Sequence, residues 1–166
     1  DALYRLAAAG VRVPKPFNFL DGVLLMELVT DEHGDAASRL NDVLFTPGEA
    51  RTHHATLLGE VVRMLVAGVV HGDLSEFNVL LAADGPMIID LPQAVDAAGN
   101  NHASRMLLRD VANLRNFFGR FAPELLGTNY GPEMWDLYLR GDLQVDSVLT
   151  GQFDQRLAPV DLGPDG

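Results

Sequence analysis

Two long segments of the chain repeat apolar residues at helical spacing. The first opens with Thr46, Pro47 and Glu49, which supply an N-cap, a proline at the first helical position and a glutamate three residues after the cap, and Gly68 ends it. Its apolar stripe consists of Ala50, His54, Leu57, Val61 and Leu65. The second stripe consists of Leu107, Val111, Leu114, Phe118 and Phe121. We therefore predict two amphipathic helices.

Shorter apolar runs around turn residues predict two hairpins. Asp21-Gly22 separates the strands of the first hairpin, and Asp84-Gly85 those of the second. The predicted strands are Phe17 to Leu20 with Val23 to Val29, and Val79 to Leu81 with Met87 to Ile89. Two further helices are predicted over Leu3 to Ala9, ending at Gly10, and over Met134 to Leu139. After Gly141 the chain has little periodicity, and we expect loop or disorder.

The composition narrows the class of protein. The 166 residues suit one domain or a lobe and a half of a larger one. The absence of cysteine excludes disulfides and thiolate metal sites and fits a reducing, cytoplasmic compartment. We expect no membrane span, because no run approaches the roughly 20 apolar residues that one needs. The formal charge of −11 argues against binding of nucleic acid by these residues. The first residue is Asp1, not Met, and we expect a chain cut at its N-terminus.

One constellation of polar residues carries the chemistry. The stretch Val69-Val70-His71-Gly72-Asp73-Leu74-Ser75-Glu76-Phe77-Asn78 is followed, after the second hairpin, by Ile88-Ile89-Asp90. The hairpin returns the chain so that Asp90 can face Asn78, and two converging oxygen ligands of this kind hold Mg²⁺ in many proteins. Asp73 is then available to accept a proton from an attacking hydroxyl. This layout matches the H-R-D-x-x-x-x-N loop and the distal metal aspartate of kinase chemistry.

The same residues resemble the RIO family of atypical serine/threonine kinases, and the sequence suggests a bacterial member. H-G-D-L-S-E-F-N is similar to its catalytic loop, and I-I-D-L-P-Q to its metal-binding strand end. The resemblance implies Asp73 as the catalytic base, with Asn78 and Asp90 as Mg²⁺ ligands. It implies contacts with ATP from Met26 as gatekeeper, Glu27, Val29, Leu80 and Ile89. It implies supporting roles for His71, Ser75 and Asp110.

The resemblance also implies a fold and a division of the chain. The fold is the α+β fold of protein kinases, here mostly the helical C-terminal lobe with the last helix and strands of the N-terminal lobe. Residues 1–29 are then a remnant of the N-terminal lobe with the hinge, residues 30–145 the C-terminal lobe, and residues 146–166 a tail. ATP and Mg²⁺ are the implied cofactors, and the identity of the protein substrate is left open.

Two parts of a kinase site are missing from the sequence. There is no G-x-G-x-x-G or Walker-type run, and Lys15, the single lysine, lies between two prolines outside the expected strand context. We therefore expect no meaningful phosphotransferase activity from these residues alone. His53 and His54 are adjacent in a predicted helix and point about 100° apart, so we expect a half-exposed pair and no shared metal.

Two other functions remain open at this point. A small-molecule kinase of the aminoglycoside phosphotransferase type also uses H-G-D…N…I-D, although that group often has His-Pro-Gly where this chain has Ser75-Glu76-Phe77. The short segment from Asp90 to Asp110 also leaves little room for its acceptor pocket. A nucleotide-binding pseudokinase or scaffold is the second alternative. The pair Asn78 and Asp90 argues against it, because such a cluster is costly to keep without a cation.

Overall fold

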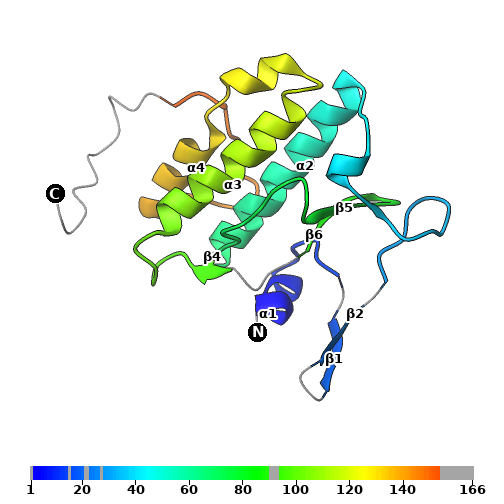
Figure 1. The fold of residues 1–166 in the computed structure, drawn as a ribbon. Coiled ribbons are helices and arrows are strands. Elements are labelled where there is room, and N and C mark those ends of the chain that lie inside the picture. Colours follow the sequence, from blue (N-terminus) through cyan, green and yellow to red (C-terminus); the bar gives the residue numbers. More distant parts are fainter. Residues whose placement is uncertain (1, 15, 21–22, 27, 90–93, 154–166) are drawn as a thin grey trace.

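The computed structural model describes residues 2–14, 16–20, 23–26, 28–89 and 94–153. It is a mixed α+β structure in which three helices pack beside small antiparallel sheets (Figure 1). The elements are α1 (Ala2–Ala8), β1 (Pro16–Leu20), β2 (Val23–Met26), β3 (Ser38–Arg39), η1 (Leu40–Asp42), α2 (Pro47–Val66), β4 (Val69–Val70), β5 (Val79–Ala82), β6 (Gly85–Ile88), β7 (Val95–Asp96), α3 (Ala103–Phe118), η3 (Pro123–Gly127) and α4 (Tyr130–Leu139).

The predicted start and end of α2 are confirmed. Thr46 has extended backbone angles, its hydroxyl accepts the Glu49 N–H at 3.2 Å, and the Glu49 carboxylate accepts the Thr46 N–H at 2.9 Å. This capping box satisfies two backbone donors that a helix N-terminus otherwise leaves unpaired. At the other end, Gly68 has a φ of 79°, a left-handed conformation that glycine adopts without steric cost. The chain then turns directly into β4.

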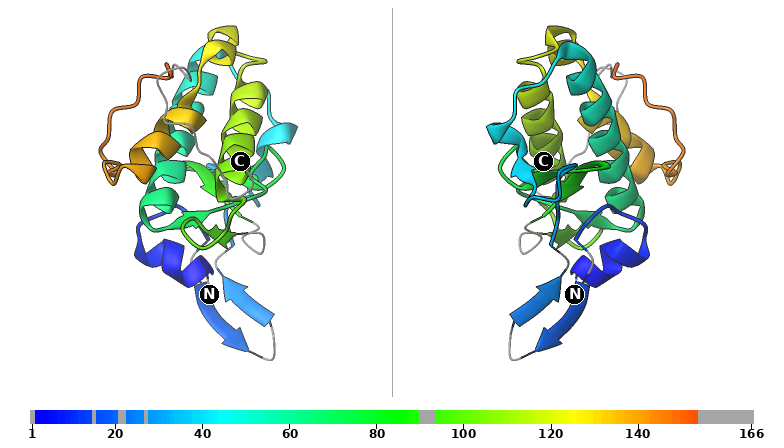
Figure 2. Two further views of the ribbon diagram at one scale, coloured as in Figure 1. Left: turned by 90° about the vertical axis from the view of Figure 1, so that its left-hand side faces the viewer. Right: turned by 90° about the vertical axis from the view of Figure 1, so that its right-hand side faces the viewer.

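The core lies between α2, α3 and α4. All five residues of the predicted α2 stripe are buried, and on α3 the stripe is buried from Leu107 to Phe118. The five residues of the α2 stripe are Ala50, His54, Leu57, Val61 and Leu65. Phe121 lies beyond the end of α3, so the predicted helix was too long at this end. Each of the three helices contacts the other two, so they form a small bundle, and short strands pack against α2 and α3 (Figure 2).

The prediction of a half-exposed histidine pair is wrong for His54. His54 is only 2% exposed, whereas His53 is half-buried. The ring of His54 packs edge-on against Phe118 and Tyr130, with centroid separations of 5.8 and 5.9 Å. Burial lowers the pKa of His54 to about 4, because the surrounding rings offer nothing to solvate an imidazolium. His54 is therefore a neutral core residue.

The sheets are antiparallel and small. β1 pairs with β2, β4 with β7, and β5 lies between β3 and β6. The two predicted hairpins are confirmed, but their bounds differ from the prediction. β2 ends at Met26, not at Val29, and the turn between β5 and β6 consists of Ala83 and Asp84. The turn residues predicted for the first hairpin, Asp21 and Gly22, are outside the described residues.

The segment after α1 connects the N-terminal residues to the β5–β6 hairpin. The backbone N–H of Arg12 donates to the Glu60 carboxylate at 2.9 Å, and its carbonyl accepts the Ile88 N–H at 3.1 Å. Its guanidinium donates to both carboxylate oxygens of Asp84. These contacts place β6 against α2.

The chain after α4 has no helix or strand over residues 142–153, as predicted. It is nevertheless held to α4, because the Glu133 carboxylate accepts hydrogen bonds from the backbone N–H groups of Thr150 and Gly151. Nothing in the sequence pattern predicted this contact. No helix in the described ranges is long and apolar enough to cross a bilayer.

Candidate active site

The loop that connects β4 to β5, residues 71–78, contains four of the predicted site residues: His71, Asp73, Ser75 and Asn78. Val69 and Val70 are buried in front of it, and Leu74 anchors its middle in the core. Gly72 has a φ of 89°, which a side chain would strain. The loop thus leaves the core, turns at Gly72, and re-enters the core at Leu74. Asp73 is the residue that this path leaves on the surface.

Asp110 on α3 holds the two backbone amides that flank Asp73. Its carboxylate oxygens accept the N–H groups of Gly72 at 2.8 Å and Leu74 at 3.0 Å. The residue is 1% exposed, and this burial raises the pKa of the Asp110 carboxyl. The two N–H donors and the positive charge of Arg109 act in the opposite direction, so the loop itself supplies part of the solvation that the carboxylate has lost.

Two further residues of α3 bind the same stretch of loop, and sequence reasoning missed both. Arg109 donates from its guanidinium to the Gly72 carbonyl at 2.5 Å, and Asn113 donates from its amide to the Leu74 carbonyl at 3.0 Å. With Asp110, they occupy one face of the helix. The available signal was three polar residues on one side of an amphipathic helix, a pattern that by itself indicates a solvent-exposed face.

His71 joins the loop to the end of the β5–β6 hairpin. Its Nε2 lies 3.0 Å from the carbonyl oxygen of Ile89, and its Nδ1 accepts the Asp73 N–H at 3.2 Å. A carbonyl can only accept and an N–H can only donate, so this pattern assigns the ring proton to Nε2. The imidazole is 2% exposed and spans the space between the two segments.

Asn78 contacts both the loop and the end of the β5–β6 hairpin. Its amide nitrogen donates to the Asp73 carbonyl, and its amide oxygen accepts the Ser75 N–H at 2.8 Å. Its backbone carbonyl accepts the Ile89 N–H at 2.9 Å. Ile89 is therefore hydrogen bonded to Asn78 through its N–H and to His71 through its carbonyl. The next residue, Asp90, is outside the described residues.

The side chains of Asp73 and Ser75 differ in their surroundings. The Asp73 side chain is exposed, and within the described ranges its carboxylate has no hydrogen-bond partner, although its backbone is held on both sides. The Ser75 hydroxyl accepts the Phe77 N–H at 3.3 Å and so serves the conformation of the loop. The arrangement offers a fixed backbone with one free carboxylate at its surface.

The residues predicted to contact a nucleotide base come from two regions of the chain, the segment around β2 and the β5–β6 hairpin. Leu80 and Ile89 are half-buried and belong to the same hairpin region, where Leu80 pairs with Met87. Val29 is buried, and its carbonyl accepts the Ala37 N–H at 3.0 Å. Met26 ends β2, and Glu27 is outside the described residues. No hydrogen bond in the described part of the chain joins Val29 to Leu80 or Ile89.

One of the two predicted metal ligands, Asn78, lies among the described residues. Among the described residues, no group of three or more histidine, cysteine, aspartate or glutamate side chains could hold a metal. The amide oxygen of Asn78, however, is an oxygen ligand of the kind that Mg²⁺ prefers, and it retains a lone pair beside the Ser75 hydrogen bond. The donor chemistry of Asn78 fits a hard cation. Asp90, the second predicted ligand, is outside the described residues.

Comparison with known proteins places the loop within a region shared with a protein family. The model of the RIO domain family matches residues 1–130. A Haloferax volcanii protein, RIO-type serine/threonine-protein kinase Rio1, is 42% identical over 123 residues, which cover 71% of this chain and 39% of that protein. Serine/threonine-protein kinase RIO3 of Caenorhabditis elegans is 33% identical over 171 aligned positions, covering 98% of this chain and 33% of that protein. Serine/threonine-protein kinase RIO1 of Homo sapiens is 34% identical over 119 residues, covering 71% of this chain and 21% of that protein.

A mixed α+β structure that presents an H-G-D…N loop, and whose relatives are named serine/threonine kinases, defines a member of a kinase family. The chain belongs to the RIO domain family. The resemblance stated from the sequence is therefore confirmed, and the family favours a RIO-type kinase over the aminoglycoside phosphotransferase alternative. The chain spans about two fifths or less of the three relatives compared above. The bacterial source stays a prediction.

Proposed function

We propose that these residues form the catalytic-loop part of a RIO-type serine/threonine protein kinase or ATPase. The finer fold that we propose is mostly the helical C-terminal lobe of a protein kinase, over residues 30–145. Residues 1–29 then belong to the N-terminal lobe and the hinge, and residues 146–166 to a tail. The observation that carries the proposal is the position of Ile89, which is hydrogen bonded to both Asn78 and His71 immediately before Asp90.

In this proposal Asp73 is the general base. Its carboxylate is exposed, and hydrogen bonds from α3 hold the backbone on either side of it. The proton of an attacking hydroxyl passes to Asp73, the hydroxyl oxygen forms a bond to the γ-phosphorus, and the bond from that phosphorus to the β,γ-bridging oxygen breaks. ADP leaves with that oxygen. Such a reaction needs positioning more than covalent help, which suits a loop whose backbone is fixed at six points.

Asn78 and Asp90 are the proposed ligands of the metal ion that accompanies ATP. Mg²⁺ at this position would neutralise charge on the phosphate oxygens. His71 holds Ile89 beside Asn78, so the proposed role of His71 is to keep the two metal ligands together.

The proposed contacts of the adenine are Met26, Glu27, Val29, Leu80 and Ile89. Family membership supports the use of ATP. No glycine-rich loop occurs in the sequence, so we expect little turnover by the 166 residues alone.

Calorimetric titration of ATP with Mg²⁺ tests the site in the full chain and in two variants. We expect Asp73→Asn to keep the Mg²⁺-dependent part of ATP binding, because the proposed base is not a ligand. Asp90→Asn should weaken it by at least tenfold, because it removes a charged ligand. Release of ADP is measured in the same samples. Mg²⁺-dependent affinity that survives in Asp90→Asn would contradict the metal assignment.

Mn²⁺ provides an independent readout, because it broadens the amide signals of nearby residues in NMR spectra. We expect broadening at Asn78 and Ile89 in the wild-type chain and its loss in Asp90→Asn. Asp142→Asn, in the segment after α4, removes an equal charge from an exposed position and serves as the control. If broadening centres elsewhere, or the control behaves as Asp90→Asn does, the proposed site is wrong.

A further inference from the structure

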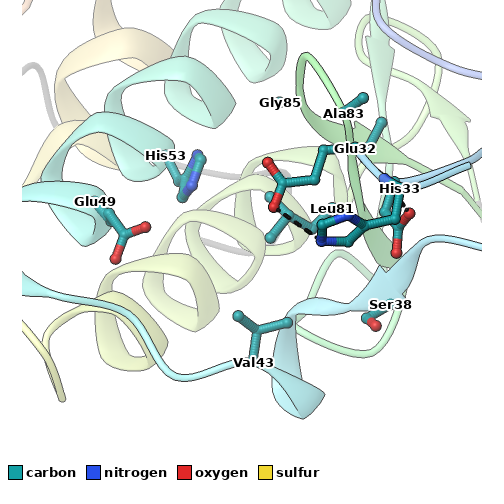
Figure 3. A pocket seen from close by; sticks show the side chains of 11 residues that line it. Glu32, His33, Ser38, Val43, Glu49, His53, Leu81, Ala83 and Gly85 are labelled. Carbon is teal, nitrogen blue, oxygen red and sulfur yellow. Dashed lines mark hydrogen bonds and ion pairs between the residues drawn. The ribbon is translucent and has the colours of Figure 1, made fainter. Parts of the chain in front are cut away.

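A cavity outside the proposed active site lies at the opposite end of β5 from the catalytic loop. Its volume is about 350 Å³, and it opens between the start of α2, the β5–β6 turn and the turn formed by residues 31–38. Figure 3 shows Glu49 and His53 approaching it from α2, with Glu32 and His33 across from them. The catalytic loop enters β5 at Val79, whereas the cavity is lined by Leu81, Ala82 and Ala83. We call this cavity the β5-end groove.

The walls of the β5-end groove are held in place by the fold. The turn on one side is closed by Asp31, whose carboxylate accepts the N–H groups of His33 and Asp35. The Thr30 carbonyl accepts the Ala83 N–H at 3.1 Å, and Ser38 pairs with Leu81. On the other side, Glu49 is fixed by the capping box of α2. A binding surface built from such elements needs little ordering when a partner arrives.

The floor of the groove is apolar and its rim is acidic. Leu81 and Val43 line the groove and pack on the hydrophobic core. The rim carries the carboxylates of Asp31, Glu32 and Glu49, and no lysine or arginine is among the described residues that line the groove. Hydrogen bonds from Thr46 lower the pKa of Glu49, and burial lowers that of His53, so at neutral pH the imidazole of His53 does not offset the acids. The exposed ring of His33 lies beside Glu32, with its Nε2 3.4 Å from the carboxylate, so an incoming guanidinium takes the place of this contact (Figure 3).

We propose that the β5-end groove docks an arginine-containing segment of a protein partner. The guanidinium lies between the carboxylates of Glu32 and Glu49, and apolar atoms of the segment cover Val43 and Leu81. Complementary charge selects the segment, and arginine suits the rim better than lysine because its planar fork can pair with two carboxylates. The groove lies apart from Asp73, so this inference does not rest on the proposed phosphoryl transfer.

A fluorescein-labelled peptide of sequence acetyl-Ala-Arg-Arg-Ala-Leu-Ala tests the groove by fluorescence anisotropy with the full chain. The same peptide with citrulline in place of both arginines has nearly the same shape without the charge. We expect the arginine peptide to bind at least tenfold more tightly than the citrulline peptide. Amide signals of Leu81 and Ala83 should shift during the titration. Equal binding of the two peptides, or shifts confined to other residues, would overturn the proposal.

Two double variants separate the groove from the general negative charge of the chain. Glu32→Gln with Glu49→Gln removes the rim charges, and glutamine retains the capping box at the start of α2. We expect it to weaken the arginine peptide by fivefold or more. Asp142→Asn with Asp146→Asn makes the same change in net charge at exposed positions after α4, and should leave the affinity within twofold. Equal losses in both variants would show non-specific attraction and refute the docking site. Circular dichroism checks that both variants fold.

Discussion

The carboxylate of Asp110 lies 2.8 Å from the backbone nitrogen of Gly72, although 38 residues separate them in the chain. The same side chain reaches the Leu74 nitrogen, so one buried acid fixes both peptide groups around Asp73. Arg109 and Asn113 bind the carbonyls of Gly72 and Leu74. Helix α3 thus satisfies both the donors and the acceptors of the loop, and the orientation of the Asp73 backbone depends on how α3 packs.

Replacing Asp110 with alanine should therefore destabilise the chain strongly. Two buried N–H groups lose their acceptor, at roughly 1–3 kcal/mol for each buried group left unpaired. We expect a loss of at least about 2 kcal/mol in the free energy of unfolding, measured by urea denaturation. Asp110→Asn should lose less, because its amide oxygen can still accept one of the two bonds. Asp142→Ala, at an exposed position, should change stability little. A loss below about 0.5 kcal/mol for Asp110→Ala would show that the hydrogen bonds from Gly72 and Leu74 to Asp110 do not stabilise the folded chain.

The sequence predicted elements whose signals are local. The α2 cap, its apolar stripe and the glycine that ends it all lie within 23 consecutive residues, and the structure has each of them. Asp110 was singled out through a family resemblance, and its placement beside the loop is consistent with a bracing role. The partners Arg109 and Asn113 were not found, because their roles exist only once α3 packs on a loop more than 35 residues away.

The histidine pair shows how a local argument can fail. Adjacent helical residues point about 100° apart, and we used this geometry to expect a half-exposed pair without a shared metal. The same geometry means that one of the two histidines can point into the core while the other points away from it. His54 is the one that belongs to the apolar stripe of α2, and it is the buried one. Its burial follows from the stripe and not from the polarity of the residue. The contact of Glu133 with residues 150–151 was equally out of reach, because the segment has no periodicity to reveal it.

The capping box of α2 gives a second prediction. Thr46→Ala removes the hydroxyl that accepts the Glu49 N–H, so we expect a loss of about 1 kcal/mol in the free energy of unfolding. Thr46→Ser keeps the oxygen and should stay close to the wild type. Thermal unfolding followed at 222 nm compares the three proteins. If alanine and serine behave alike, the cap observed at this helix start does not stabilise it.

The junction after α3 gives a third prediction from two glycines. A Cβ added at Gly119 would lie 2.8 Å from the Arg115 carbonyl oxygen and would collide with the Leu126 side chain. Gly119→Ala should therefore cost about 1–3 kcal/mol, the usual range for forced overpacking. Gly127→Ala is the matched control, because a Cβ there meets nothing within 4 Å. Urea denaturation of both variants should separate them, and equal stabilities would mean that the junction relaxes freely.

The buried imidazole of His54 gives the last prediction, a dependence of stability on pH. Its pKa is about 4 in the folded chain and about 6.5 when unfolded. A folded pKa below the unfolded one means that the unfolded chain takes up the proton first. The contribution of His54 is therefore complete above pH 6.5 and is lost as the pH falls toward 4, by up to about 3 kcal/mol.

His54→Leu isolates this contribution, because leucine cannot take up a proton. Asp110, whose pKa is raised by burial, favours the folded chain on the acid side and so has the opposite slope, but it is present in both proteins. The difference in unfolding free energy between wild type and His54→Leu should thus shift against the wild type between pH 7 and pH 4. Parallel profiles for the wild type and His54→Leu would contradict this prediction, because they would mean that the imidazole takes up a proton inside the core. The described structure offers no hydrogen-bond acceptor to the unpaired Nε2 of His54.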